Sequence, residues 1–274
     1  MFWIGVLDIM EIPNINILAG YSTITGDFFC LNPIWNYVLG SVSLANWFGA
    51  SYAAILLAIN RCLETCAPRY ASKLFDGKKT LVWLLFPTGF WFYTLLFQLP
   101  CIYSPEYFAC FFDPYFGTEF HDPIKFANYY HAFHDTFVFV VLIILYVIIC
   151  IGIWVKYKQV KSHSTAIKQQ RIMNIQSTVI CIQTVIACAI YVYMQFFYAP
   201  RFVIAMGHIF WQALHGDIAF VYLIVNASLR KAVRKTFLKI FCSKNTTKLV
   251  AQQVRPLKQT QGTVPTADLQ NITT

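Results

Sequence analysis

The side chains best suited to chemistry lie in one short segment, Tyr129-Tyr130-His131-Ala132-Phe133-His134-Asp135. Because His131 and Asp135 are four residues apart, they share a face if the segment is helical, and His134 lies one turn from His131. A metal site here would need further ligands from other helices, and the nearest candidates are His208 and His215. We expect no metal or other cofactor. The segment is expected to form a polar and aromatic wall of a ligand pocket; the alternative is hydrogen bonding between helices plus an aromatic belt at the membrane surface.

A second set of polar side chains recurs at helical spacing, at His208, Trp211, Gln212 and His215. Residues three or four apart fall on one face of a helix. A stripe that faces only lipid would not carry two histidines and a glutamine, so this face is expected to point into a helix bundle. Trp35 and Asn36 are expected to lie across from it. The expected pocket consists of Trp35, Asn36, Tyr130, His131, His134, Asp135, His208, Trp211 and Gln212.

Two acids, Asp8 and Glu11, lie one turn apart in an apolar stretch near the start of the chain. Acids in a membrane span are costly and usually face the protein interior. Asp8 is expected to face that interior, which Asp217 and His215 of the last span would share. For Glu11 the alternative is a position at the membrane surface, reached by its flexible side chain.

The composition indicates an integral membrane protein. Hydrophobic residues make up 58% of the chain, and charged residues make up 12%, about half the usual share. The net charge of +9 does not indicate nucleic-acid binding, because the positive residues lie in loops between apolar stretches. The sequence contains no Gly-rich phosphate loop, HExxH or CxxC motif and no Ser-His-Asp order with supporting turns, so we predict no enzyme.

Apolar stretches of roughly 20 residues predict membrane-spanning helices. They lie approximately over 2–23, 34–62, 80–103, 127–155, 172–197 and 203–226. An amphipathic helix is expected over 229–242, with basic residues on one side and Val233, Phe237, Ile240 and Phe241 on the other. The polar tail, 243–274, is expected to be disordered.

The distribution of basic residues predicts the orientation of these spans. Lysines and arginines gather in the loops 61–79 and 156–171 and in the tail, whereas Asp27, Glu106, Asp113, Glu119 and Asp122 lie in the opposite loops. The basic side is expected to be cytoplasmic, and the C-terminus with it. An even number of spans then places Met1 on the cytoplasmic side as well.

Three segments together resemble a known family. They are Gly5-Val-Leu-Asp8-Ile-Met10, Leu57-Ala-Ile-Asn60-Arg61-Cys-Leu-Glu64, and His215-Gly216 followed by Tyr222-Leu-Ile-Val-Asn226 and Arg230. Their order and placement are similar to those of the nematode chemoreceptors called serpentine receptor class T, within the seven-transmembrane G-protein-coupled receptors. The resemblance implies an all-α membrane protein with a receptor-like helix bundle. The six spans would correspond to helices two to seven, so the first helix of the family is expected to be missing from this chain.

The resemblance also implies roles for particular residues. Those expected at the G-protein-coupling switch are Asn60, Arg61, Glu64, Tyr222, Asn226 and Arg230. Asn60 stands where rhodopsin-like receptors carry an acid, so a resting lock on Arg61 would be weaker or would use Glu64. The alternative is that Arg61 is an ordinary anchor at the cytoplasmic surface. Asp8 resembles the family's second-helix acid. Ile218 and Ala219 replace the usual Asn-Pro of the last helix.

Three cysteines, Cys30, Cys101 and Cys110, lie toward the expected outer side, where disulfides form. The preferred pair is Cys30 with Cys110, which would tie the start of one helix to the long outer loop, although Cys30 is farther from Arg61 than the matching cysteine of rhodopsin-like receptors. Cys242 ends the amphipathic segment, a position suited to palmitoylation.

The resemblance implies a chemosensory receptor that detects an extracellular small molecule or peptide and signals through a heterotrimeric G protein. It would be a multi-pass protein of the plasma membrane, including the membrane of a sensory cilium. The lipid bilayer would be its other partner. The alternatives are a transporter or channel with Asp8, Asp135 and Asp217 on its pathway, and a truncated receptor without function.

Overall fold

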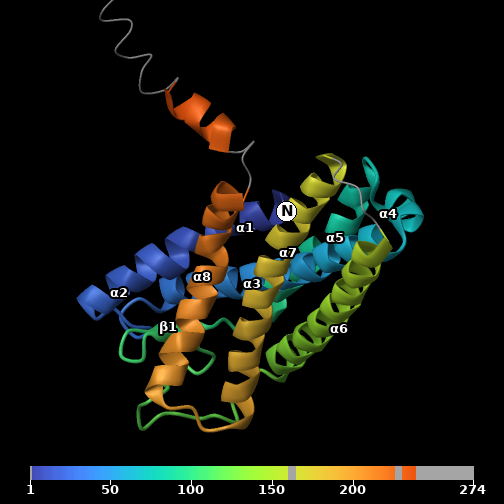
Figure 1. Ribbon diagram of the computed structural model, residues 1–274. Helices are drawn as coiled ribbons and strands as arrows, with labels where there is room; N and C mark the ends of the chain where they lie inside the picture. The colour runs from blue at the N-terminus through green and yellow to red at the C-terminus, as the bar shows by residue number, and fades with distance from the viewer. Residues whose placement is uncertain (1, 160–164, 226–229, 239–274) are drawn as a thin grey trace, which may run out of the picture. The chain divides into compact units, whose positions relative to one another are not determined.

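The computed structural model describes residues 2–159, 165–225 and 230–238. The chain divides into two units, residues 1–226 and 227–274, which are described separately. The first unit contains α1 Phe2–Ile12, π-helix η1 Pro13–Leu18, α2 Ala19–Thr25, α3 Pro33–Cys66, α4 Pro68–Phe75, α5 Lys79–Phe97, β1 Ile102–Ser104, β2 Ala109–Phe111, α6 Tyr129–Gln159, α7 Thr165–Phe196 and α8 Arg201–Val225 (Figure 1). In the second unit, residues 230–238 are helical.

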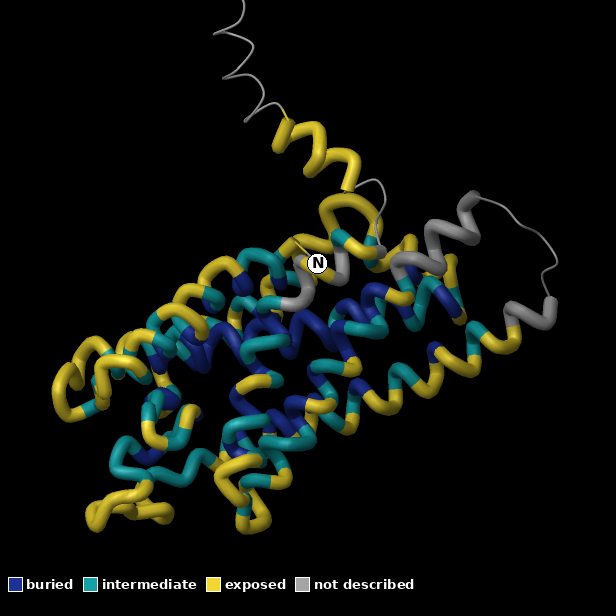
Figure 2. The backbone as a smooth tube through the Cα atoms, turned by 60° about the vertical axis from the view of Figure 1, so that its left-hand side comes forward, coloured by how far each residue is buried: buried dark blue, intermediate teal, exposed yellow. Residues whose placement is uncertain are grey.

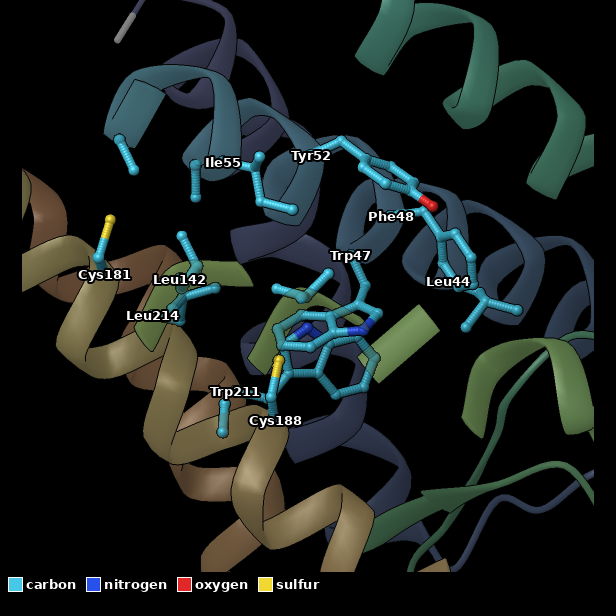
Figure 3. Close-up of a cluster of buried hydrophobic side chains, with 14 of the residues drawn as sticks. Leu44, Trp47, Phe48, Tyr52, Ile55, Leu142, Cys181, Cys188, Trp211 and Leu214 are labelled. Atoms are coloured by element: carbon cyan, nitrogen blue, oxygen red, sulfur yellow. The ribbon is translucent and has the colours of Figure 1, made fainter. Parts of the chain in front are cut away.

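Helix α3 is the centre of the first unit. It packs against α1, α5, α6 and α7, and α8 closes the bundle between α1 and α7. Most of its length from Gly40 to Ala58 is buried, and small residues such as Gly49 and Ala53 let neighbouring helices approach. Side chains from α3, α6, α7 and α8 form one buried cluster, which includes Trp47, Leu142 and Leu214 (Figure 3).

The outer helices have the exposed apolar faces expected of a protein in lipid. Within the described residues, five helical segments are long and apolar enough to cross a membrane, over 2–25, 33–66, 79–97, 129–155 and 174–196. Only the one in α3 is mostly buried. Figure 2 shows buried residues concentrated inside the unit and exposed ones on its outer faces. The predicted span 203–226 coincides with α8, several of whose side chains lie outside the description.

The first membrane segment, 2–25, changes its winding at Pro13. Proline lacks a backbone N–H and interrupts the α-helical ladder, and here the chain adopts six residues of π-helix before the α-helix resumes at Ala19. Gly26 ends the segment in the left-handed conformation that favours glycine. The predicted start and end of this span, 2–23, differ from the observed ones by at most two residues.

One short helix and a β-hairpin were not predicted from the sequence. The short helix α4 begins at Pro68, a residue favoured in the first turn of a helix. Strands β1 and β2 form an antiparallel hairpin in which Tyr103 pairs with Cys110. The predicted span 80–103 ran through β1, whereas α5 ends at Phe97 before Pro100. The end of the bundle that carries β1 and β2 is called the hairpin end, and the opposite end is called the α4 end.

A close backbone approach fixes the hairpin on α3. A Cβ atom built on Gly40 would lie 2.2 Å from the carbonyl oxygen of Cys101, which is backbone and cannot rotate away. We expect Gly40→Ala to lower the free energy of unfolding by about 1–3 kcal/mol, the usual cost of overpacking. Chemical unfolding in detergent would measure it. Gly20→Ala is the matched control, since nothing lies within 4 Å of its Cβ. Equal stability of both variants would contradict the close contact.

Candidate functional site

A cavity of about 900 Å³ lies at the hairpin end of the bundle. Its lining comes from α3, α6, α7 and α8, from the hairpin, and from the loops 112–128 and 197–200. Most lining side chains are apolar or aromatic, among them Leu44, Trp47, Phe112, Tyr191 and Trp211. Volumes of this size are typical of sites for small organic ligands.

Asp135 organises a buried polar network directly beneath this cavity. Its Oδ1 accepts hydrogen bonds from Trp47 Nε1 at 2.9 Å and from the ring nitrogen Nδ1 of His134 at 3.0 Å. His131 Nε2 lies 3.4 Å from Oδ2. Asp135 is fully buried, so these donors replace the water that a carboxylate would otherwise require. The network joins α3 to α6.

The two histidines extend this network to α7 and along α3. Gln195 lies 3.0 Å from His131 Nδ1, and an amide N–H there makes Nδ1 the acceptor and places the ring proton on Nε2, facing Asp135. His134 Nε2 lies 3.0 Å from the hydroxyl of Ser51, and its ring stacks on Phe48 at 3.8 Å. Three helices therefore meet around one carboxylate.

A second buried network joins α1, α3, α5 and α8. Asp8 Oδ1 lies 2.8 Å from His215 Nδ1. Glu11 accepts a hydrogen bond from Asn46 Nδ2 at 2.6 Å, and Trp91 Nε1 donates to the Asn46 side-chain oxygen at 2.8 Å. Glu11 is completely buried, so it does not extend to the membrane surface.

The π-helix η1 supplies backbone and side-chain groups to the same region. Gln212 of α8 donates to the carbonyl oxygen of Ile15 at 2.7 Å. Asn14 donates to the hydroxyl of Ser43 at 2.6 Å and to the carbonyl of Leu39 at 2.9 Å. π-Helical turns inside helices often occur at functional sites because they expose such groups.

The predicted pocket residues occupy three different environments. His131 and Trp211 line the cavity. Tyr130, His134, Asp135, His208 and Gln212 lie in the packed layer around it, with His208 against the rings of Tyr103 and Trp211. Trp35 is exposed and Asn36 is half-buried in the first turn of α3, about three helical turns before Trp47. Neither lines this cavity.

Several functional candidates were missed by the sequence analysis. They are Trp47, Asn46, Trp91 and Gln195, each of which hydrogen-bonds within one of the two networks. Asn46 and Trp47 stand out only as polar-bearing side chains inside an otherwise small and apolar stretch. Among the described residues, no group of three or more His, Cys, Asp or Glu is placed to hold a metal ion.

At the α4 end, Arg61 is buried and forms an ion pair with Glu64 one turn further along α3. Asn60 is half-buried beside it. Because both partners lie on α3, this pair alone does not join two helices. The side chains of Asp217 and Tyr222, and residues Asn226 and Cys242, lie outside the described residues. Arg230 is exposed in the helix 230–238, where its side chain has further contacts.

The predicted Cys30–Cys110 disulfide is not formed in the structure. Both residues are free thiols, and Cys30 is exposed before α3. The hairpin instead places the thiol of Cys110 in a hydrogen bond with the thiol of Cys101. This hydrogen bond and burial both raise the pKa of the Cys110 thiol well above its usual value.

We therefore expect a water-soluble maleimide to modify Cys30 at least about ten times faster than Cys110 at pH 7, because only the exposed thiolate reacts readily. The raised pKa leaves little thiolate on Cys110 at neutral pH, so its rate should continue to rise as the pH increases. Site-resolved mass spectrometry of the solubilised protein measures both rates. A peptide containing Cys30 linked to Cys110 would contradict this expectation.

The fold defines a multi-pass helical membrane protein with a cavity at one end of its bundle. Residues 1–248 match the family described as serpentine type 7TM GPCR chemoreceptor Srt. The chain belongs to this family of receptors, which confirms the resemblance to serpentine receptor class T. It is also similar to serpentine receptor class T-55 of Caenorhabditis elegans, with 27% identity over 252 residues. That match covers 88% of this chain and 64% of the relative, so the chain spans less than two thirds of the relative's length.

Proposed function

We propose that this chain is a chemosensory receptor that binds an extracellular small molecule in the cavity at the hairpin end and signals to a heterotrimeric G protein at the α4 end. The observation that carries the proposal is the position of Trp47, which both lines the cavity and donates to Asp135. A ligand that contacts this indole acts on the network that joins α3, α6 and α7.

Helix α3 connects the two ends of the bundle. Trp47 and Arg61 are 14 residues apart, about 21 Å along the helix, with buried residues along most of the interval. A ligand that binds one packing of the helices more tightly than another shifts the population toward it. Such a shift at the cavity changes how the helices pack around Arg61. In the opened bundle, Arg61 then becomes accessible to a G protein.

In this proposal, the receptor lies in the plasma membrane, including the membrane of a sensory cilium. Its hairpin end faces the outside of the cell, and its α4 end faces the cytoplasm. The basic residues of α4, Arg69 and Lys73, support this orientation. The C-terminal segment would then also be cytoplasmic, where Cys242 could be palmitoylated.

The test is ligand-dependent nucleotide exchange. The chain would be reconstituted in lipid vesicles with purified heterotrimeric G proteins and screened against a library of small organic molecules. At least one compound is expected to raise the exchange rate in vesicles that contain the chain, but not in empty ones. Saturable substrate flux in the same vesicles, without any effect on exchange, would overturn the proposal and favour a transporter.

A further inference from the structure

The cavity wall contains almost no charge. Among the described residues that line it there is no lysine, arginine or glutamate, and its acidic and imidazole side chains are those of Asp113, His121 and His131. Asp113 is already satisfied, because it accepts from His121 Nδ1 at 2.6 Å and from the backbone N–H groups of Tyr115 and Asp122 at 2.8 and 2.9 Å. An ionised ligand group would therefore lose its hydration without gaining a counter-charge, which is costly in a buried site.

Two residues that line the cavity carry buried hydrogen-bond donors without a partner among the described residues. These donors are the indole Nε1 of Trp211 and the side-chain amide nitrogen of Asn128. Trp211 is only 4% exposed, and its ring lies edge-on to both Tyr191 and His208. Figure 3 shows it within the buried cluster together with Trp47. Buried donors nearly always have an acceptor, and an indole nitrogen can only donate.

Three other polar groups of the lining, on Trp47, Gln195 and Asn128, already have partners. Trp47 Nε1 donates to Asp135, and the Gln195 amide lies against the His131 ring. The Asn128 side-chain oxygen accepts from the backbone N–H of His131 at the start of α6. The buried donors on Trp211 and Asn128 would thus be satisfied by one or two hydrogen-bond acceptors within this largely aromatic lining.

We propose that the cavity binds an uncharged, ring-bearing organic molecule whose carbonyl-type oxygen accepts a hydrogen bond from Trp211 Nε1. This inference rests on the proposed function, since it assigns a ligand class to the same cavity. The aromatic walls contact the rings of the ligand. The unpaired indole N–H selects a ligand with an oxygen acceptor. A hydrocarbon of the same shape would bind more weakly, because it would leave this buried donor without a hydrogen bond.

Three probes of similar shape separate these contributions. Benzophenone carries the carbonyl, 1,1-diphenylethylene replaces the oxygen by a CH₂ group, and 4-benzoylbenzoate adds a charge. Binding to the chain in lipid nanodiscs would be measured against empty nanodiscs, which removes partitioning into lipid. We expect benzophenone to bind about 3–10 times more tightly than 1,1-diphenylethylene, the usual range for one hydrogen bond, and 4-benzoylbenzoate to show no saturable binding.

Trp211→Phe removes the N–H and keeps an aromatic ring. It should weaken benzophenone binding by about 3–10-fold and leave 1,1-diphenylethylene unchanged, which also shows that the variant is folded. Trp35→Phe is the matched control, because Trp35 is 59% exposed and does not line the cavity. It should change neither affinity.

Each other outcome overturns the ligand class. Equal affinities of the ketone and the hydrocarbon would remove the acceptor from the argument, as would equal losses of both in Trp211→Phe. Saturable binding of 4-benzoylbenzoate would contradict an uncharged ligand. If no probe binds above the empty nanodiscs, the class is wrong, whereas the receptor function still stands or falls by the exchange screen with other compounds.

Discussion

Asp135→Ala is expected to lower the free energy of unfolding of this protein by about 2–4 kcal/mol. The substitution leaves Trp47 and His134 without their buried acceptor and removes the neighbour of His131. Each unpaired buried donor costs about 1 kcal/mol or somewhat more, and polar contacts in membrane proteins lie at the lower end of that range. The loss of three contacts together gives the expected total.

Unfolding in detergent with increasing sodium dodecyl sulfate, followed by circular dichroism, would measure this change. Asp135→Asn provides a second comparison, because it retains the volume and one acceptor oxygen and should cost less than the alanine. Asp76→Ala is the matched control, since Asp76 is exposed at the end of α4. If Asp135→Ala and Asp76→Ala unfold alike, the network does not stabilise the contact between α3 and α6.

The long helices were predictable because a membrane helix must satisfy its backbone polar groups internally and present apolar side chains to lipid. Most predicted ends lie within a few residues of the observed ones, with 34–62 extended to Cys66 in α3. The prediction failed at Tyr103, where hydropathy alone could not distinguish the end of a span from an apolar hairpin. Ile102 of β1 is buried because this strand packs on α3.

The candidate site was only partly predictable for a related reason. Helical spacing placed His131 near Asp135 and grouped Trp211 with His215, since these relations lie within single helices. Spacing does not specify which residues of another helix lie opposite. Trp35 was therefore expected at the pocket, whereas the register of α3 against α6 brings Trp47 there instead.

The part of the cavity wall that comes from the hairpin and the loop 112–128 could not be predicted at all. Its path is set by local contacts such as Asp113 with the backbone of Asp122 and by the close approach of Cys101 to Gly40. No periodic pattern encodes such contacts. The same path separates Cys30 from Cys110 and pairs Cys110 with Cys101, which explains why the preferred disulfide was wrong.

Arg61→Gln is expected to reduce ligand-stimulated nucleotide exchange by at least about tenfold. It removes the charge-assisted contact that Arg61 is proposed to make with the G protein, and the loss of such a buried contact commonly costs about 2 kcal/mol or more. This expectation rests on the proposed coupling at the α4 end. Arg69→Gln is the matched control, because Arg69 is exposed in α4 and should change exchange by less than about twofold. Benzophenone binding by both variants would show that the cavity is intact. Unchanged exchange in Arg61→Gln would leave Arg61 as a surface anchor.

Substitution of Glu64 tests whether its ion pair with Arg61 holds the resting arrangement. This ion pair is partly exposed, with about a third of the Glu64 side chain accessible, and such pairs contribute at most about 1 kcal/mol. If the pair holds Arg61 in the resting arrangement, Glu64→Gln should raise exchange without ligand by about 2–5-fold, the factor that corresponds to this energy. If Arg61 is needed only in the active arrangement, Glu64→Gln leaves the basal rate unchanged while Arg61→Gln still abolishes stimulation. A higher basal exchange rate in Glu64→Gln together with lost stimulation in Arg61→Gln would therefore indicate that the Arg61–Glu64 pair of α3 holds the resting arrangement.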